Sequence, residues 1–201
     1  MKKILLTSVS VAMATFASNA TVRPYVSAHI GYTNANLIVT DRVDHNLQGE
    51  WLGDKFAFDV SGAFGIKYDL SKSLALRGEL EYDYVEGAKN SEMDDPWWWR
   101  SHTVLANAYI DVKTMSVFTP YFSIGAGYQF IHHNNFYIND STLSALAWQI
   151  GCGIAYNVTN TLSVDLGYRY LTSTASVKAS GHDFKLHFNN SQFRLGVNYA
   201  F

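Results

Sequence analysis

The chain alternates large apolar residues with polar or small residues along most of its length, with a period of two. This period is typical of β-strands, because successive side chains of a strand point to opposite faces. The clearest segment runs from Lys55 to Asp69, where Phe, Val, Ile and Tyr occupy every second position apart from Gly62. The final segment, Ser191 to Phe201, repeats the pattern and ends on an aromatic residue.

The alternation predicts strands separated by polar connections. Eight segments follow the pattern, at residues 25–33, 55–69, 74–85, 102–112, 121–131, 144–156, 162–170 and 191–201. Each is long enough to cross a bilayer at a tilt, which takes about nine to eleven residues. The pattern therefore predicts an all-β fold, an eight-stranded antiparallel up-and-down transmembrane β-barrel.

The connections between these segments alternate between short and long. The long connections are residues 34–54, 86–101, 132–143 and 173–188. Membrane barrels place their short turns at the periplasmic rim and their long loops outside the cell. We therefore expect four long extracellular loops.

The first twenty residues, 1–20, predict a cleaved signal peptide. Two lysines precede an apolar stretch from Ile4 to Phe16, and Ser18 to Ala20 forms a small-x-small cleavage site. Cleavage would leave residues 21–201 as one outer-membrane barrel domain. That domain would keep 13 of the 15 basic residues against 17 acidic ones, a formal net charge of −4. Its mild acidity argues against a nucleic-acid partner, which usually requires a basic surface.

Two absences in the sequence narrow the class of protein further. Cys152 is the only cysteine, so the exported chain has no internal disulfide. The mature chain has no uninterrupted apolar run of about twenty residues, so we expect no transmembrane helix. Aromatic residues make up 15% of the sequence. For an exported chain of this composition, a closed barrel is the remaining way to cross a membrane.

The two faces of the strands differ enough to predict which one lines the lumen. A soluble barrel of the lipocalin type would turn its apolar face inward. The interior of an eight-stranded barrel, however, is only just wide enough for side chains to fill, and the apolar face carries too many aromatic rings to enclose. We therefore expect the apolar face toward lipid and a paired network of charges in the lumen. The predicted network comprises Lys67, Arg77, Glu79, Glu81, Asp83, Asp111, Asp165, Arg169 and Arg194.

Several strand segments resemble the small outer-membrane barrels of the opacity-protein and neisserial surface protein A type. These are grouped with the OmpA-like transmembrane domain and carry a porin-family label. The resemblance rests on Asn107 to Asp111, Phe118 to Tyr128, Leu166 to Tyr170 and the terminal strand. It implies the outer membrane of a Gram-negative bacterium and a cell-surface protein. Members of the family act as adhesins, invasins or binders of complement regulators, or are structural, and the resemblance does not reach the loops that carry such functions.

The most unusual segment of the predicted loops contains Trp97, Trp98, Trp99 and Arg100. Two interpretations of this segment remain open. It is either an exposed patch that docks on a host surface, since Trp and Arg are enriched in binding hot spots, or an interface anchor among the lipopolysaccharide headgroups, where Trp commonly lies.

The sequence predicts no catalytic, cofactor or metal site. His132 and His133 have no cysteine or carboxylate close in sequence to complete a metal site. Ser101 and His102 are neighbours in a strand, so their side chains point to opposite faces and cannot act as a nucleophile and its base. We therefore expect that the protein is not an enzyme.

Three functions remain open at this stage. The first is a surface interaction protein of the adhesin or invasin kind that uses the long loops. The others are a narrow pore with porin-type activity and a purely structural barrel. The expected partners are outer-membrane lipid and lipopolysaccharide, the barrel assembly machinery and, for an adhesin, a host cell-surface or serum protein. Phe201 resembles the terminal aromatic signal that the assembly machinery reads, and we expect a monomer without cofactors.

Overall fold

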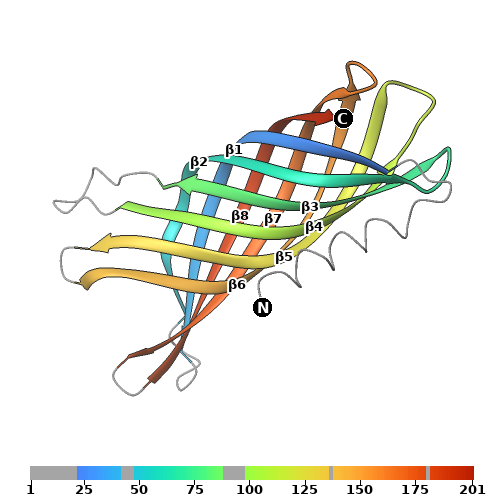
Figure 1. Ribbon diagram of the computed structural model, residues 1–201. Coiled ribbons are helices and arrows are strands. Elements are labelled where there is room, and N and C mark those ends of the chain that lie inside the picture. Colours follow the sequence, from blue (N-terminus) through green and yellow to red (C-terminus); the bar gives the residue numbers. More distant parts are fainter. Residues whose placement is uncertain (1–21, 42–47, 88–97, 136–137, 180–181) are drawn as a thin grey trace, which may run out of the picture.

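The computed structural model describes residues 22–41, 48–87, 98–135, 138–179 and 182–201, which form a closed antiparallel barrel (Figure 1). Neighbours in the chain are neighbours in the barrel, and the last strand pairs with the first. The strands are β1 (Val22–Asp41), β2 (Gln48–Asp69), β3 (Leu74–Glu86), β4 (Trp98–Val112), β5 (Phe118–Asn135), β6 (Ile138–Asn157), β7 (Leu162–Ala179) and β8 (His182–Ala200). The predicted eight-stranded up-and-down barrel is confirmed.

Alternate residues of each strand face the outside and the lumen. On β3, Leu80 is 61% exposed and Tyr82 48%, whereas Glu81 is 1% exposed and Asp83 is fully buried. Soluble monomers rarely expose contiguous apolar surface on this scale. The apolar face therefore points outward and the charged face inward, as the sequence predicts.

Aromatic residues gather toward the two ends of the outer surface. On β8, Leu195 and Val197 separate Phe193 from Tyr199. The same order occurs on β5, whose exposed outward residues include Phe118, Phe122, Ile124, Tyr128 and Phe130. Such aromatic girdles mark the two membrane interfaces of transmembrane barrels. The apolar surface between them is the lipid-facing part of the barrel.

The predicted extent of three long loops is wrong, because most of their residues belong to strands. Paired strand covers much of 34–54, 132–143 and 173–188, and only 42–47, 136–137 and 180–181 lie outside the described residues there. The segment 86–101 is also shorter than expected, since β4 begins at Trp98. Beyond the lipid, the outer face of a strand need not be apolar. The period-two signal therefore fades where backbone pairing continues.

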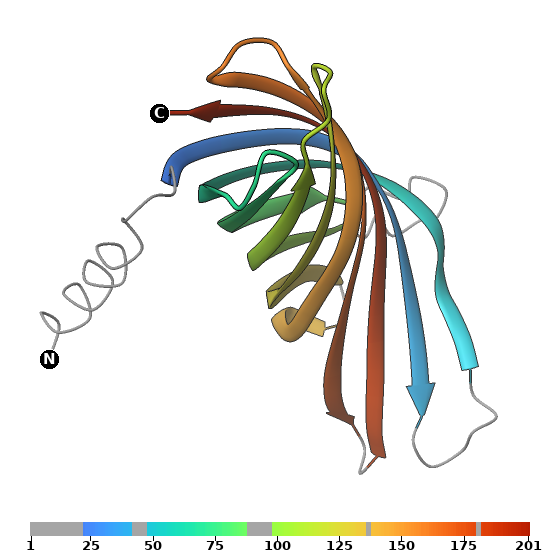
Figure 2. The same ribbon diagram turned by 90° about the vertical axis from the view of Figure 1, so that its right-hand side faces the viewer.

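The extracellular end of the barrel divides into two groups of strands. Pairing of β2 with β3 stops at Phe58↔Glu86, and pairing of β6 with β7 stops at Leu146↔Thr174. In contrast, β7 and β8 remain paired as far as Ala179↔His182. We call the ends of β7, β8, β1 and β2 the first lobe and the ends of β3 to β6 the second lobe. Figures 1 and 2 show the two lobes running apart.

The barrel closes where β8 pairs with β1. The register runs from Tyr25↔Ala200 to Asp41↔Phe184, and the Phe201 N–H donates to the Pro24 carbonyl at 3.0 Å. No helix among the described residues is long and apolar enough to cross a membrane. The expected signal peptide, residues 1–20, lies outside the described residues.

The assignment of faces predicts the effect of a charge on the outer surface. Leu166 is outward-facing, 60% exposed, and paired with Ile154 and Leu195. We expect Leu166→Arg to lower the free energy of unfolding by about 2–4 kcal/mol, because it places a cation in hydrocarbon. Urea titration of the barrel refolded into phospholipid vesicles measures this loss.

A matched control for this substitution lies in the turn between β2 and β3. Leu70 is 52% exposed there, outside the strands. We expect Leu70→Arg to change the free energy of unfolding by less than about 0.5 kcal/mol, as is usual at exposed sites. Equal effects of the two substitutions would contradict the membrane assignment.

Candidate functional site

Two arginines and two carboxylates form the centre of a buried ion-pair network in the lumen. Glu81 accepts a hydrogen bond from Arg169 at 2.9 Å and another from Arg194 at 2.5 Å. Arg169 also lies 3.0 Å from Asp83. All four side chains are buried, and they come from β3, β7 and β8. Buried charges are stable when they are paired and hydrogen-bonded, and this network pairs them across the lumen.

A layer of tyrosines lies next to this network, toward the periplasmic end. The guanidinium carbon of Arg77 is 4.2 Å from the ring centroid of Tyr109, 5.2 Å from that of Tyr121 and 5.8 Å from that of Tyr25. These distances are within the range of cation–π attraction. The hydroxyls of Tyr25 and Tyr109 donate to Glu79, the former at 2.7 Å. Aromatic rings and charges together fill this level of the lumen.

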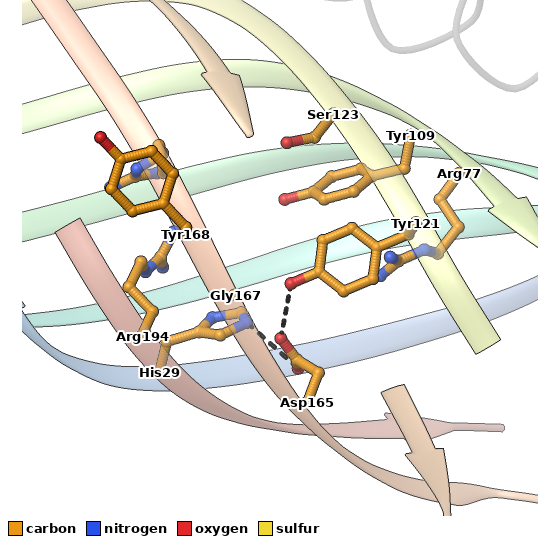
Figure 3. Close-up of a pocket in the computed structure, with 10 residues that line it drawn as sticks. His29, Arg77, Tyr109, Tyr121, Ser123, Asp165, Gly167, Tyr168 and Arg194 are labelled. Atoms are coloured by element: carbon orange, nitrogen blue, oxygen red, sulfur yellow. Dashed lines mark hydrogen bonds and ion pairs between the residues drawn. The ribbon is translucent and has the colours of Figure 1, made fainter. Parts of the chain in front are cut away.

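A small cavity of about 20 Å³ lies between the two layers (Figure 3). Asp165 is in its wall and accepts a hydrogen bond from Tyr121 at 2.9 Å, while Nε2 of His29 lies 3.5 Å from the same carboxylate. Arg77 and Arg194 from the neighbouring layers also line the cavity. This volume has room for about one water molecule.

Toward the extracellular end the lumen holds an apolar cluster among buried polar side chains such as Thr103 and Gln129. Leu105, Ala147 and Leu171 form a fully buried cluster, and Val85 and Ile131 are also buried. The sequence analysis predicts the charges of the lumen face but not this apolar cluster. In the described part of the barrel, an aromatic layer, a charged layer and a layer of mixed apolar and polar side chains follow one another from the periplasmic end and fill the lumen, as expected for eight strands.

The structure places all nine residues of the predicted charge network on the inner face. Seven are buried, and Lys67 and Arg77 are half-buried. They do not form one network of ion pairs, and Glu79 and Asp165 bind mainly uncharged side chains and His29. Asp111 pairs with Lys67 at 2.8 Å and with Arg77 at 2.9 Å near the periplasmic mouth, apart from the group around Glu81.

Several further lumen residues lie outside the charge network that the sequence predicts. Tyr25, Tyr109 and Tyr121 carry the aromatic layer, and His29 and Asn107 complete the hydrogen bonding of the acidic residues. All of them have the inward parity of their strands. Extending that parity to every polar and aromatic residue would have identified them.

The tryptophan segment does not lie wholly in a loop, contrary to the prediction. Trp98 and Trp99 are the first two residues of β4, where they pair with Asn134 and His133. Trp97 lies outside the described residues. Arg100 is exposed and lies between Glu86 and His132 in the register. The segment therefore begins a strand at the extracellular rim.

The residues considered for catalysis lie as the sequence predicts. Ser101 is fully buried on the inner face, whereas His102 lies on the outer face with its Nδ1 2.5 Å from the Tyr82 hydroxyl. Ser101 and His102 therefore cannot act as a nucleophile–base pair. Within the described ranges, no group of three or more His, Cys, Asp or Glu residues is placed to hold a metal ion.

Residues 4–201 match the family model of the outer membrane protein beta-barrel domain. The chain belongs to this family. The match spans the strands described above, so this member of the family is located in the outer membrane. It also confirms the resemblance to small outer-membrane barrels.

Individual relatives agree with this family. Outer membrane protein PagN of Salmonella typhimurium is 31% identical over 121 residues, which cover 51% of this chain and 50% of PagN. An uncharacterized protein of Brucella abortus is 30% identical over 164 residues, covering 65% of this chain and 57% of that protein. The chain thus spans about half the length of the curated relatives it matches. The crystal structure of neisserial surface protein A shares the fold, with a TM-score of 0.61, 18% identity and coverage of 92% of this chain and 100% of the neisserial one.

The ion pairs of Glu81 generate a stability prediction. We expect Glu81→Gln to lower the free energy of unfolding by about 3–5 kcal/mol, because it leaves Arg169 and Arg194 short of a counter-charge in a buried site. The matched control is Glu86→Gln at the exposed end of β3, for which less than about 0.5 kcal/mol is expected. Urea unfolding in vesicles compares the two, and equal losses would contradict the role of the network.

The filled lumen generates a second prediction, on conductance. We expect purified monomers in planar bilayers to show no stable large conductance step, because the stacked layers leave room for about one water molecule between the charged and aromatic levels. A widened variant, Arg77→Ala with Tyr121→Ala, provides a comparison in which the aromatic level is opened. A stable large conductance from the unmodified barrel would contradict the filled lumen.

Proposed function

We propose that this outer-membrane barrel is a surface interaction protein of the adhesin or invasin kind, which binds a host cell-surface or serum protein through its extracellular lobes. The observation that carries the proposal is the length of paired strand beyond the lipid-facing surface. Crossing the membrane does not require this length, since about nine to eleven residues per strand are enough.

The outward residues of β1 mark where the lipid-facing surface ends. On β1 the exposed residues Ile30 and Tyr32 are followed by the polar outward positions Asn34 and Asn36. Strand β1 then continues from Thr33 to Asp41 in register with β8. Nine strand residues extend about 30 Å along the strand. The first lobe therefore offers a surface well outside the membrane.

The separation of the two lobes adds strand edges to this surface. Beyond Phe58, toward the extracellular end, the edge of β2 that faces β3 has no partner strand among the described residues. Beyond Thr174, the edge of β7 that faces β6 likewise has no partner strand among them. Strand edges present backbone donors and acceptors that can pair with an extended segment of another protein. These edges support a protein partner.

We also infer that the protein is not an enzyme and uses no cofactor. The buried acids and bases of the lumen are engaged with one another, as Glu81 is with Arg169 and Arg194. Catalysis requires a nucleophile, a base and an orienting group that converge on a substrate. The pairing of the lumen charges supports a structural role for them instead.

We further infer how the protein reaches its place. Residues 1–20 would be removed on export, and the terminal strand ending at Phe201 would be read by the barrel assembly machinery. The aromatic outer surface fits lipid and lipopolysaccharide as neighbours. One chain closes the barrel by itself, which favours a monomer.

Shortening the lobes tests the proposed function. Thr174 and His187 are opposite each other on β7 and β8, with Oγ1 and Nδ1 3.1 Å apart. Replacing residues 175–186 with Asn-Gly would join them by a two-residue hairpin turn. We expect bacteria that display this variant to bind host cells about tenfold less than bacteria with the full barrel. Heat-modifiable migration on gels checks that the variant barrel is folded.

A matched edit at the opposite rim provides the control. Replacing Thr159 to Thr161 in the exposed β6–β7 turn with Gly-Asn-Gly alters the periplasmic end alone, and binding should be unchanged. A second variant shortens β1 and β2 by replacing residues 38–51 with Asn-Gly. Undiminished binding by folded barrels with both hairpins shortened would refute binding through the first lobe.

A further inference from the structure

A cavity of about 320 Å³ opens at the periplasmic end of the lumen. This volume lies within the range of about 300–1,000 Å³ that is typical of small-molecule pockets. Strands β1, β2 and β3 and the β4–β5 turn each contribute one basic residue to its lining. The four basic residues are Arg23, Lys67, Arg77 and Lys113.

Asp111 is the carboxylate in the described lining of this cavity. It lies 2.8 Å from the ammonium of Lys67 and 2.9 Å from Nε of Arg77. Asp111 is nearly fully buried, whereas Lys67 retains 24% exposure of its side chain. One carboxylate therefore holds two cations at the wall and balances half of their charge.

Asp69 repeats this arrangement with the other two cations. It lies 2.8 Å from Arg23 and 2.6 Å from Lys113, and all three side chains are between 25% and 33% exposed. Nε of Arg23 is buried and has no protein acceptor. Two carboxylates thus face four cations, and Glu79 lies one level inward on the same face of β3 as Arg77, so the cations outnumber the carboxylates around the cavity.

The aromatic layer of the lumen forms the inner end of the cavity. Tyr25 and Arg77 line the cavity and also belong to that layer. The next carboxylate inward is Glu79, which accepts hydrogen bonds from Tyr25, Tyr109 and Asn107. The cavity is therefore a pocket entered from the periplasm, and the filled lumen above it prevents passage through the barrel.

The outer edge of the pocket is rich in neutral hydrogen-bonding groups. They come from the β4–β5 and β6–β7 turns, and they include Thr114, Ser116, Thr159, Asn160 and Thr161. The Thr114 hydroxyl donates to the Phe118 carbonyl within its turn, whereas the amide of Asn160 can donate to the oxygens of an anion. This amide adds to the guanidinium groups, whose planar N–H donors suit the oxygens of carboxylates and phosphates.

We propose that this pocket binds a small dianionic oxyanion of the phosphate type, either inorganic phosphate or a phosphate monoester, from the periplasmic side. The positive excess and the guanidinium groups of Arg23 and Arg77 suit the charge and the oxygens of such a ligand. A concave site with one sign of excess charge also concentrates the field on its ligand. The site is independent of the extracellular lobes, so each proposal can fail without the other.

Calorimetric titration of the folded barrel in detergent tests the pocket. Inorganic phosphate should bind measurably at about millimolar concentrations, and added sodium chloride should weaken it. Lys113→Gln should weaken binding about fivefold, because it removes one cation from the pocket. Asp69→Asn should strengthen binding about threefold, because it raises the positive excess.

The matched control is Lys72→Gln. Lys72 lies in the exposed β2–β3 turn, at the same rim but outside the described lining of the pocket. Its substitution should leave phosphate binding unchanged. Equal losses from Lys72→Gln and Lys113→Gln, or no heat from phosphate at about ten times that concentration, would overturn the proposal.

Glycerol 3-phosphate and sodium chloride serve as the remaining probes. Tighter binding of glycerol 3-phosphate than of inorganic phosphate would identify a phosphate monoester as the ligand class, and the reverse order would identify free phosphate. Either order supports a dianion site if chloride at the same ionic strength gives no saturable heat. Saturable binding of chloride with equal affinity would overturn it.

Discussion

The pairing of β8 with β1 is the constraint on which the rest of the structure depends. In hydrocarbon an unpaired backbone N–H or C=O group costs several kcal/mol, so a sheet that crosses a membrane has to close on itself. With eight strands, closure also fixes the width of the lumen. The interior is then too narrow for a continuous water-filled channel and too wide to leave empty. This width therefore requires side chains that fill the lumen and pair each other's charges.

Glycine is the residue that makes room for the large lumen side chains. A Cβ atom at Gly65 would lie 2.7 Å from the ring of Tyr25, and one at Gly153 would lie 2.5 Å from the ring of Tyr121. Real Cβ atoms do not approach other heavy atoms so closely. The aromatic layer therefore depends on small residues of the neighbouring strands as much as on the tyrosines themselves. The small residues on the inward parity are thus part of the same packing.

The strands, their faces and their order could be predicted because lipid contact imposes the period-two pattern directly. The two lobes could not be predicted, because strands beyond the membrane have water on their outer face and therefore carry no period-two pattern. The sequence also could not predict which residues pair across the lumen. Glu81 and Arg194 are 113 residues apart, and their contact depends on the width of the closed barrel. The sequence could have predicted that the polar residues Tyr121 and His29 face the lumen, because both share the inward parity of their strands. The sequence could not predict the periplasmic pocket, because the pocket combines cations from separate strands.

The early end of pairing between β2 and β3, and between β6 and β7, has a consequence for how stability is distributed. Backbone hydrogen bonds near the middle of the barrel can open only if several strands part together, whereas those in each lobe are shared by few strands. Local opening should therefore be graded, with the most labile amides at the cell surface. Residue changes in one lobe are also insulated from the other lobe and from the membrane. The same barrel can thus tolerate a varied exterior while its transmembrane part stays fixed.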